Sequence, residues 1–155
     1  MDLHDSDDPA ARLQAHILER IPLARAMQLS VTRFSGGEIE MRAPLQPNIN
    51  DKGCAFGGSM ASLMTLAGWG LIELGLRARG LACDIYVGDT QLRYREPVWG
   101  ELRAVARYTE AGEPDRLAAA LHERGKGRAG VVCEIAGETQ PAASLAALFF
   151  ARRHA

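Results

Sequence analysis

The sequence predicts an α+β fold in which a curved antiparallel sheet wraps around one buried helix. The stretch from Cys54 to Ile72 contains no charged residue, which is typical of a helix buried on every side. Segments before and after it alternate apolar and polar side chains, the pattern of half-buried strands. In a chain of 155 residues, a sheet is the element able to surround such a helix.

The same stretch is long enough to cross a membrane, but its composition and flanks argue against a span. It is interrupted by four glycines and by Ser59, Ser62 and Thr65. Its flanks are short amphipathic segments without the Lys and Arg bias of membrane loops. We therefore interpret residues 1–155 as a single globular domain with a frayed tail at residues 1–8.

Composition excludes several classes of function. The net charge of −1 argues against nucleic acid or an anionic membrane as the main partner. Three cysteines without C-x-x-C spacing indicate neither a zinc site nor a disulfide framework, and they fit a reducing cytosol. The N-terminus lacks the pattern of a signal peptide, so we expect a cytoplasmic protein. Neither a metal-binding H-E-x-x-H spacing nor a Ser-His-Asp order is present, and we expect no metal.

Local signals place the other elements. Asp8 caps a helix that Pro9 begins and Pro22 ends. Alternation predicts strands, and a polar, alanine-rich stretch predicts a second short helix. The predicted elements are strands at 27–34 and 38–42, the central helix from Gly57, strands at 84–95 and 102–108, a helix at 113–127, and strands at 131–135 and 143–152. The last strand is apolar on both faces, which predicts a central position in the sheet.

The loop before the central helix carries the candidate chemistry. Gly57 and Gly58 lie where the helix begins, so an oxyanion can approach the free backbone N–H groups and the positive end of the helix dipole. Asn48, Asn50 and Asp51 supply polar groups a few residues away. The alternative is an ordinary loop in which these side chains form turns and cap the helix.

This loop resembles a known family. The spacing N-x-x-G-x-x-H-G-G is typical of hotdog-fold acyl-CoA thioesterases of the phenylacetate-pathway type, and this chain has Asn50, Gly53, Phe56, Gly57 and Gly58 at those places. The string NDKGCAFGGSMASLMTLAGWG is closer to the thioesterase-like domain found C-terminal to an acetyltransferase domain in some bacterial proteins. The resemblance extends over residues 10 to 153. It implies a hotdog fold that assembles as a homodimer or a dimer of dimers, with active sites between protomers.

The resemblance also implies the reaction. It indicates hydrolysis of an acyl-CoA or acyl-carrier-protein thioester, with coenzyme A as part of the substrate and no separate cofactor. Asn50 would orient the carbonyl or the water, and the N–H groups of Gly57 and Gly58 would polarise the carbonyl. The further residues that we expect to bind substrate are Asn48, Phe56, Thr65, Arg93 and Arg95.

Two positions depart from the family pattern. Phe56 stands where many relatives have His, and Thr65 stands where many have the catalytic Asp or Glu. Threonine cannot act as a base near neutral pH, so another carboxylate must activate water. Asp51 is our first candidate because it is near the glycines in sequence, and Asp89 on a later strand is the second.

Three functions remain open from sequence. The first is thioester hydrolysis, and the second is hydration or dehydration, which ranks low because the His-bearing motifs of such relatives are absent. The third is a non-catalytic protein that binds acyl thioesters, which the loss of the carboxylate at Thr65 makes a serious alternative. Cys54 lies near the helix start, but no histidine is near it in sequence to activate a thiolate.

Overall fold

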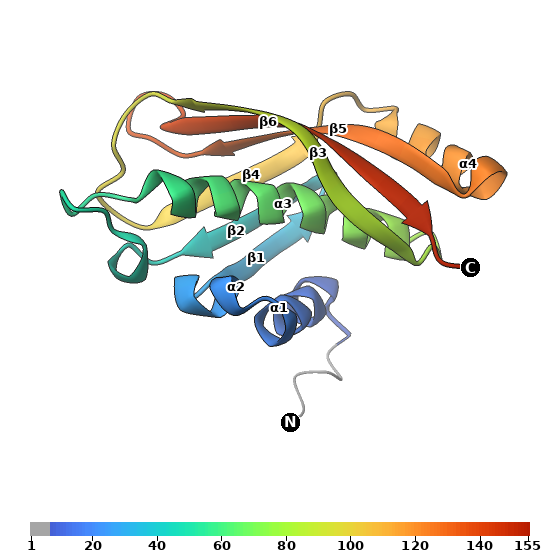
Figure 1. The fold of residues 1–155 in the computed structure, drawn as a ribbon, viewed down its shortest axis with the longest axis horizontal. Coiled ribbons are helices and arrows are strands. Elements are labelled where there is room, and N and C mark those ends of the chain that lie inside the picture. The colour runs from blue at the N-terminus through green and yellow to red at the C-terminus, as the bar shows by residue number, and fades with distance from the viewer. Residues whose placement is uncertain (1–6) are drawn as a thin grey trace.

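The computed structural model describes residues 7–155 and contains one six-stranded antiparallel sheet with order β1-β2-β4-β5-β6-β3. The sheet curves over the long helix α3, while α1 and α2 lie on the far side of that helix from β6 (Figure 1). The elements are α1 (Pro9–Arg20), α2 (Pro22–Met27), β1 (Ser30–Ser35), β2 (Glu38–Ala43), η2 (Gln46–Asn48), α3 (Gly57–Arg77), β3 (Cys83–Tyr94), β4 (Leu102–Tyr108), α4 (Glu113–Arg124), β5 (Lys126–Ile135) and β6 (Ala143–Arg153).

The N-terminal helix begins as its sequence predicts. The Asp8 carboxylate accepts a hydrogen bond from the Ala10 N–H (3.2 Å), and Pro9 is the first helical residue. The predicted frayed tail falls mostly on residues 1–6, which lie outside the described residues. Asp8 itself belongs to the ordered cap.

The strand predicted from Met27 begins three residues later, at Ser30. Pro22 does end α1, but it also begins the short helix α2, because proline is favoured at a first helical position. Gln28 then closes α2 in the left-handed region (φ 56°). The apolar alternation at Met27 and Leu29 was therefore misleading: both side chains are buried, but from a helix end and a turn rather than from a strand.

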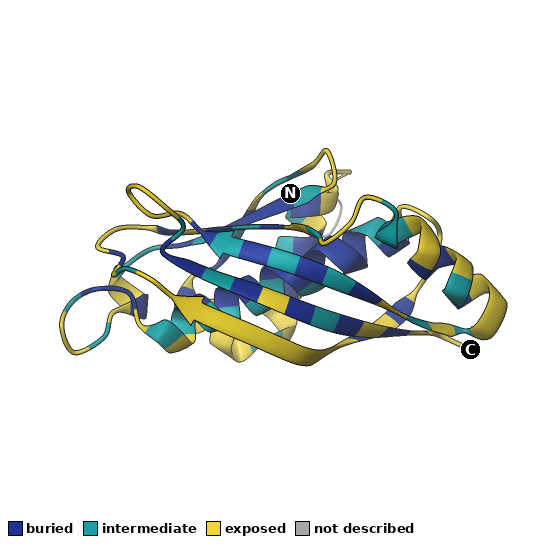
Figure 2. Cartoon of the chain, turned by 90° about the horizontal axis from the view of Figure 1, so that it is seen from above, coloured by how far each residue is buried: buried dark blue, intermediate teal, exposed yellow. Residues whose placement is uncertain are grey.

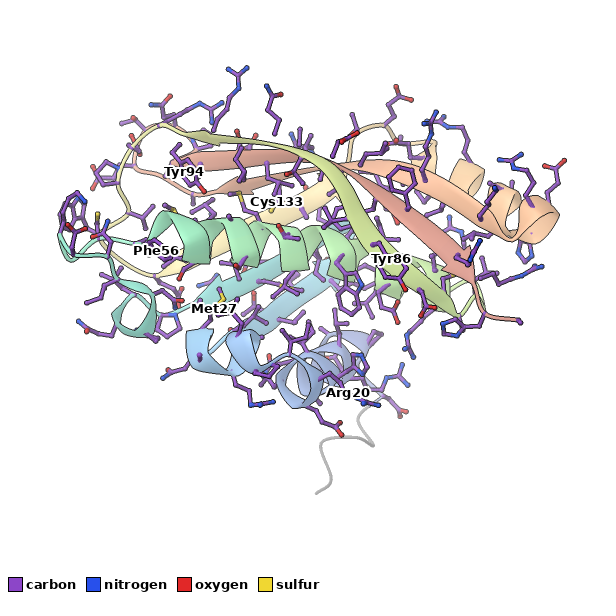
Figure 3. All side chains as sticks on the ribbon, in the orientation of Figure 1. Arg20, Met27, Phe56, Tyr86, Tyr94 and Cys133 are labelled. Carbon is purple, nitrogen blue, oxygen red and sulfur yellow. The ribbon has the colours of Figure 1, made fainter. Side chains whose placement is uncertain are left out.

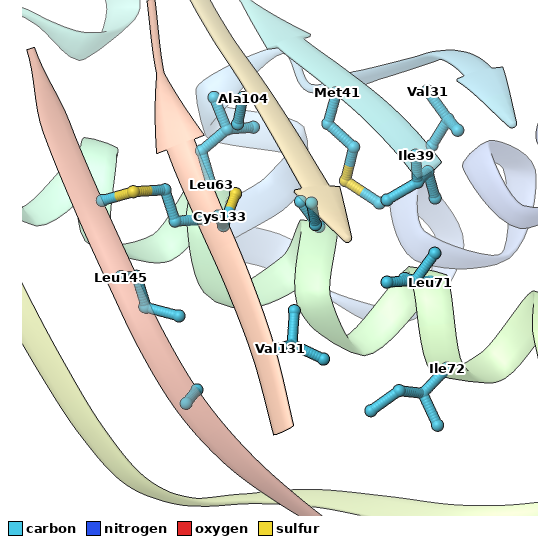
Figure 4. Packing of buried hydrophobic residues seen from close by; sticks show 14 of the residues in the cluster. Val31, Ile39, Met41, Leu63, Leu71, Ile72, Ala104, Val131, Cys133 and Leu145 are labelled. Carbon is cyan, nitrogen blue, oxygen red and sulfur yellow. The ribbon is translucent and has the colours of Figure 1, made fainter. Parts of the chain in front are cut away.

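The helix α3 is the centre of the core, as predicted. Leu63, Leu71 and Ile72 are almost fully buried and pack with sheet residues such as Met41 and Val131 (Figure 4). By length and composition α3 could cross a membrane, but most of its apolar stretch is buried inside the protein. One stripe containing Ser62, Thr65 and Trp69 is only half-buried, so the sheet covers α3 on one side rather than all around.

The C-terminal half differs from the prediction in its boundaries. The helix α4 ends at Arg124 because Gly125 adopts a left-handed conformation (φ 73°), and β5 begins at once at Lys126. The long β5 runs past the end of β4, where α4 packs against it. The last strand β6 is paired on both sides, by β5 and β3, although it lies one strand from the edge.

The strand β3 forms one edge of the sheet and is exposed along almost its whole length (Figure 2). A bulge between Val87 and Thr90 inserts an extra residue and reverses which side chains face inward. Cys83 and Ile85 face the core before the bulge, and Leu92 and Tyr94 lie on the α3 side after it. An edge of this length leaves a row of unpaired backbone groups.

The other side of the sheet holds one buried charge, at Glu40, which the alternation of β2 predicted to be exposed. Its carboxylate accepts hydrogen bonds from Thr32 Oγ1 (2.7 Å), Arg42 Nε (2.9 Å) and Arg103 Nη1 (3.0 Å). Burial alone would raise the pKa of Glu40, but these donors together lower it to about 2. Glu40 is therefore ionised and closed off by its own neighbours.

Candidate active site

The loop before α3 is a tight hairpin whose backbone is fixed at both ends. Ile49 and Ala55 form an antiparallel bridge, the Phe56 N–H donates to the Asn48 carbonyl (2.7 Å), and the Ala55 N–H donates to the Val98 carbonyl (2.8 Å). Asn48 lies beneath this loop, 1% exposed, and its amide nitrogen donates to the Met27 and Pro44 carbonyls (3.0 and 2.8 Å). This geometry makes Asn48 an anchor for the loop.

Asn50 and Asp51 lie in the turn of this hairpin. Asn50 Oδ1 accepts from the Lys52 N–H (2.8 Å), which is an Asx turn, and Asn50 Nδ2 contacts the buried Cys54 sulfur (3.2 Å). The Asp51 carboxylate is exposed and accepts from Lys52 Nζ (2.9 Å), and this ion pair lowers the pKa of Asp51. The turn residues thus satisfy one another, as the alternative interpretation of the loop expected.

The start of α3 has unsatisfied donors. The N–H groups of Gly57, Gly58 and Ser59 have no acceptor within residues 7–155, and no side chain caps this end. Such donors, combined with the helix dipole, suit a carbonyl oxygen that gains negative charge. The helix start is therefore open, in the sense that its N–H groups are free to bind a ligand, whereas the turn residues of the loop before it are hydrogen-bonded to one another.

Two aromatic rings flank these donors (Figure 3). A Cβ atom at Gly58 would lie 2.4 Å from Phe56 Cε1, so the Phe56 ring rests against this glycine and requires it. Tyr94 approaches Gly57 from β3, and its hydroxyl donates to the Gly57 carbonyl (2.9 Å). Both rings are about half exposed, at 54% and 50%. They form an apolar wall beside polar donors, an arrangement suited to an acyl thioester.

The remaining predicted site residues are scattered. Thr65 is half-buried on α3, and its hydroxyl donates to the Ala61 carbonyl of its own helix (2.8 Å). Asp89 lies at the β3 bulge, exposed and without an ion-pair partner in the described part of the chain. Arg93 is exposed, and Arg95 donates to Ser144 Oγ (3.0 Å) from the same end of β3 as Tyr94.

Arg77 and Arg79 lie at a different end of the molecule from Arg93 and Arg95. Arg77 is the last residue of α3 and pairs with Glu73, and Arg79 follows the helix and pairs with Asp115. No group of three or more metal-binding side chains occurs among residues 7–155. The site therefore consists of backbone donors and aromatic walls.

Residues 10–153 match the family described as "Putative thioesterase (yiiD_Cterm)", which spans nearly the whole chain. The chain belongs to the YiiD_C family. This confirms the family resemblance on which the loop interpretation depended. It also gives the coarse function of the YiiD_C chain, that of a thioesterase-type protein.

Solved structures support the same assignment. The chain is similar to a Chlorobaculum tepidum protein of unknown function (26% identity, 94% of each chain covered, TM-score 0.87). It is also similar to a Shewanella oneidensis "putative thioesterase" (27% identity, 95% and 99% covered, TM-score 0.85). A phenylacetic acid degradation-related protein from Ralstonia eutropha (18% identity, 89% and 98% covered, TM-score 0.64) shares the fold. The YiiD_C chain therefore has the predicted hotdog fold.

Sequence reasoning did not nominate Tyr94 for the site. Alternation along the strand places Tyr94 on the same side as Thr90 and Leu92, but the contact with Gly57 joins residues 37 apart. The available signal was an aromatic residue at the end of the strand, just before Arg95-Glu96-Pro97. Such a signal identifies an exposed aromatic residue without showing which loop it meets.

Proposed function

We propose that this protein hydrolyses an acyl thioester carried by coenzyme A or by an acyl carrier protein. The supporting observation is the open start of α3, where three consecutive N–H groups have no acceptor among residues 7–155 and lie between Phe56 and Tyr94. The thioester carbonyl oxygen would accept from these N–H groups as it becomes an oxyanion. Loss of one donor in such sites costs about 3–4 kcal/mol of transition-state stabilisation, so the backbone supplies a large part of the catalysis.

The water also needs a base, and the surroundings of the two candidate carboxylates favour Asp89 over Asp51. The charge of Asp51 is partly neutralised by Lys52, and its lowered pKa makes it a weaker base. Asp89 has no such partner among residues 7–155. Asp89 lies five positions before Tyr94, about 16 Å along a strand, so Asp89 would serve the site of a second protomer.

The proposal therefore includes a homodimer formed through β3. This strand is an exposed edge and carries Val87, Leu92 and Tyr94, which are 43%, 37% and 50% exposed. Pairing two copies of β3 would cover these side chains and satisfy the unpaired backbone groups. Light scattering at micromolar concentration tests this step, and a monomer mass would contradict it.

A panel of acyl-CoA and acyl-carrier-protein substrates, read by thiol release, tests the function. We expect turnover of at least one acyl-CoA or acyl-carrier substrate. The non-catalytic alternative rests on Thr65, whose hydroxyl is bonded to its own helix and supplies no base. Tight binding of an acyl thioester without release of thiol would replace hydrolysis by that alternative.

A further inference from the structure

The end of the sheet opposite the α3 start carries a groove that the acyl site does not use. The strand register places Tyr86, Phe150 and Arg128 opposite one another across β3, β6 and β5, and Asp84, Arg152 and Lys126 form the next row. Paired residues share one face of a sheet, and here that face points away from the buried Ile85. Together with α4, these rows line an open groove of about 750 Å³. This volume falls within the range of small-molecule sites.

The groove concentrates positive charge, since its lining holds five Lys and Arg side chains and one Asp. Lys126, Arg128 and Arg152 have no acidic partner in the part of the chain that the structure describes, and Lys126 lies directly opposite Arg152. Like charges directly opposite each other destabilise a sheet, and Asp84, opposite Arg152 on its other side, is the one acidic side chain among the described groove residues. The protein as a whole has a net charge of −1, so this is a local feature.

The acids around the groove are already paired. Asp84, the acidic residue that lines the groove, accepts a hydrogen bond from His154 Nε2 (2.9 Å). The two α4 arginines of the groove, Arg116 and Arg124, pair with Glu110 (2.8 Å) and Glu123 (3.7 Å). The three strand cations therefore remain available to an external anion.

Two exposed aromatic rings lie beside these cations. Tyr86 is 63% exposed and Phe150 is 43% exposed, and they are cross-strand neighbours. The Phe150 ring packs over Gly88, where an added Cβ would lie 2.3 Å from it, so the ring is supported from below. Flat ring faces next to phosphate-binding cations match a ligand that has both a planar base and phosphates.

We propose that this groove is a second ligand site that binds a nucleotide, with Lys126, Arg128 and Arg152 on its phosphates and Tyr86 on its base. The groove is lined by 11 residues, about half of the 20–30 that one side of a specific protein–protein interface usually contributes. An acidic protein surface is therefore the less favoured occupant.

The groove is separate from the acyl site of the same protomer. Figure 3 shows Tyr86 and Tyr94 toward opposite ends of β3. Tyr94 lies eight positions beyond Tyr86 along the strand, which is about 26 Å. Tyr86 also faces away from α3, whereas the Tyr94 hydroxyl bonds to Gly57. A nucleotide here would not place a thioester on the α3 N–H groups of its own protomer, so binding is testable without activity.

Calorimetric titration of the full chain with ADP, inorganic pyrophosphate and adenosine tests the proposal. We expect ADP to bind more tightly than pyrophosphate, and adenosine to bind weakest. Arg128→Gln should weaken ADP binding about tenfold, the scale of one charge-assisted hydrogen bond. Tyr86→Leu should weaken ADP but leave pyrophosphate unchanged. Arg20→Gln, a change of the same kind at an exposed arginine that ends α1, should change neither (Figure 3).

Titrations with two further ligands identify the source of the nucleotide. If adenosine 3′,5′-bisphosphate and coenzyme A bind more tightly than ADP, the groove binds the nucleotide end of coenzyme A. If ADP binds more tightly than both, the groove binds a free nucleotide. Either order supports a nucleotide site. Equal binding of ADP and pyrophosphate with no effect of Tyr86→Leu, no binding of any nucleotide by a protein with native circular dichroism, or binding of polyglutamate alone would each overturn the proposal.

Discussion

The two ends of α3 differ in how completely they are satisfied. At its C-terminal end, the Ala78, Arg79 and Leu81 N–H groups donate to carbonyls of the last turns, and Glu73 pairs with Arg77. At its N-terminal end, three N–H groups have no acceptor in the described chain and two aromatic rings stand half exposed beside them. The fold itself satisfies one end, and it leaves the donors of the other end free for solvent or a ligand.

The largest effect should come from the base that acts at the open end. We expect Asp89→Asn to lower kcat about 100-fold or more with little change in substrate binding, because the amide cannot take a proton from water. Asp51→Asn is the matched control, and it should have a much smaller effect because Lys52 already compensates this carboxylate. Thiol release under saturating substrate measures both.

The reverse order of these two variants would return the role to Asp51, the first candidate from sequence. Wild-type kcat in both would place the base elsewhere. Mixing Asp89→Asn protein with Gly58→Ala protein adds a test of the shared site. If Asp89 acts across the dimer, a mixed dimer contains one site with both defects and one intact site, so mixing should raise the activity above that of either variant alone. If Asp89 acts within its own protomer, mixing should give no such increase.

The next effect separates two adjacent glycines at the open end. Gly58→Ala should push the Phe56 ring off the helix start and lower kcat/KM about tenfold, because its Cβ would meet that ring at 2.4 Å. Gly57→Ala places its Cβ 3.6 Å from Tyr94, which is ordinary contact, and should change kcat/KM less than about twofold. Steady-state kinetics on one acyl substrate compares them.

A third variant resolves whether the Gly58 effect acts through the ring. In a Phe56→Leu background, Gly58→Ala should have no further effect on kcat/KM. Additive losses would mean that the alanine disturbs the N–H groups directly rather than through Phe56.

The closed end should affect stability and leave chemistry unchanged. Glu73→Gln removes the charge that pairs with Arg77 and should lower the free energy of unfolding by about 1 kcal/mol, because one partner of the pair is largely exposed. Urea unfolding measures this change, and kcat should stay at the wild-type value. A large loss of kcat would show that the two ends of α3 are coupled.

The smallest effect concerns the thiol at the open end. Cys54→Ala should change kcat less than about twofold, since Cys54 is buried and contacts only the Asn50 amide among polar side chains in residues 7–155. Loss of activity in a variant with native circular dichroism would make this cysteine a nucleophile.

The difference between the two ends also explains what sequence could predict. The fold was predictable from one charge-free helix and the alternation around it, because a buried helix or strand face requires apolar residues at regular spacing in the sequence. The open N–H groups at Gly57 and Gly58 were predictable for the same reason, since they depend on a local helix start. The boundaries at Ser30 and Lys126 were missed because Pro22 and Gly125 each end one element and begin another.

The contacts of the site were beyond sequence reasoning because they join distant positions. Tyr94 meets Gly57 across 37 residues, and the bulge at Asp89 changes which side chains of β3 face inward. The hairpin contacts that engage Asn50 and Asp51 are local, and the alternative of an Asx turn did anticipate them. The groove beside Tyr86 depends on the register of three strands, which alternation alone does not fix.

The buried carboxylate of Glu40 makes the stability of the fold depend on pH. Its pKa of about 2, against 4.5 for a free glutamate, means that the unfolded chain takes up this proton first as the pH falls. The stability that Glu40 contributes, about 3 kcal/mol, is present above pH 4.5 and is lost as the pH drops toward 2. In the Glu40→Gln variant, the urea midpoint should therefore depend less on pH over this range. The region where β1, β2 and β4 meet around Glu40 is thus the part of the sheet that acid destabilises.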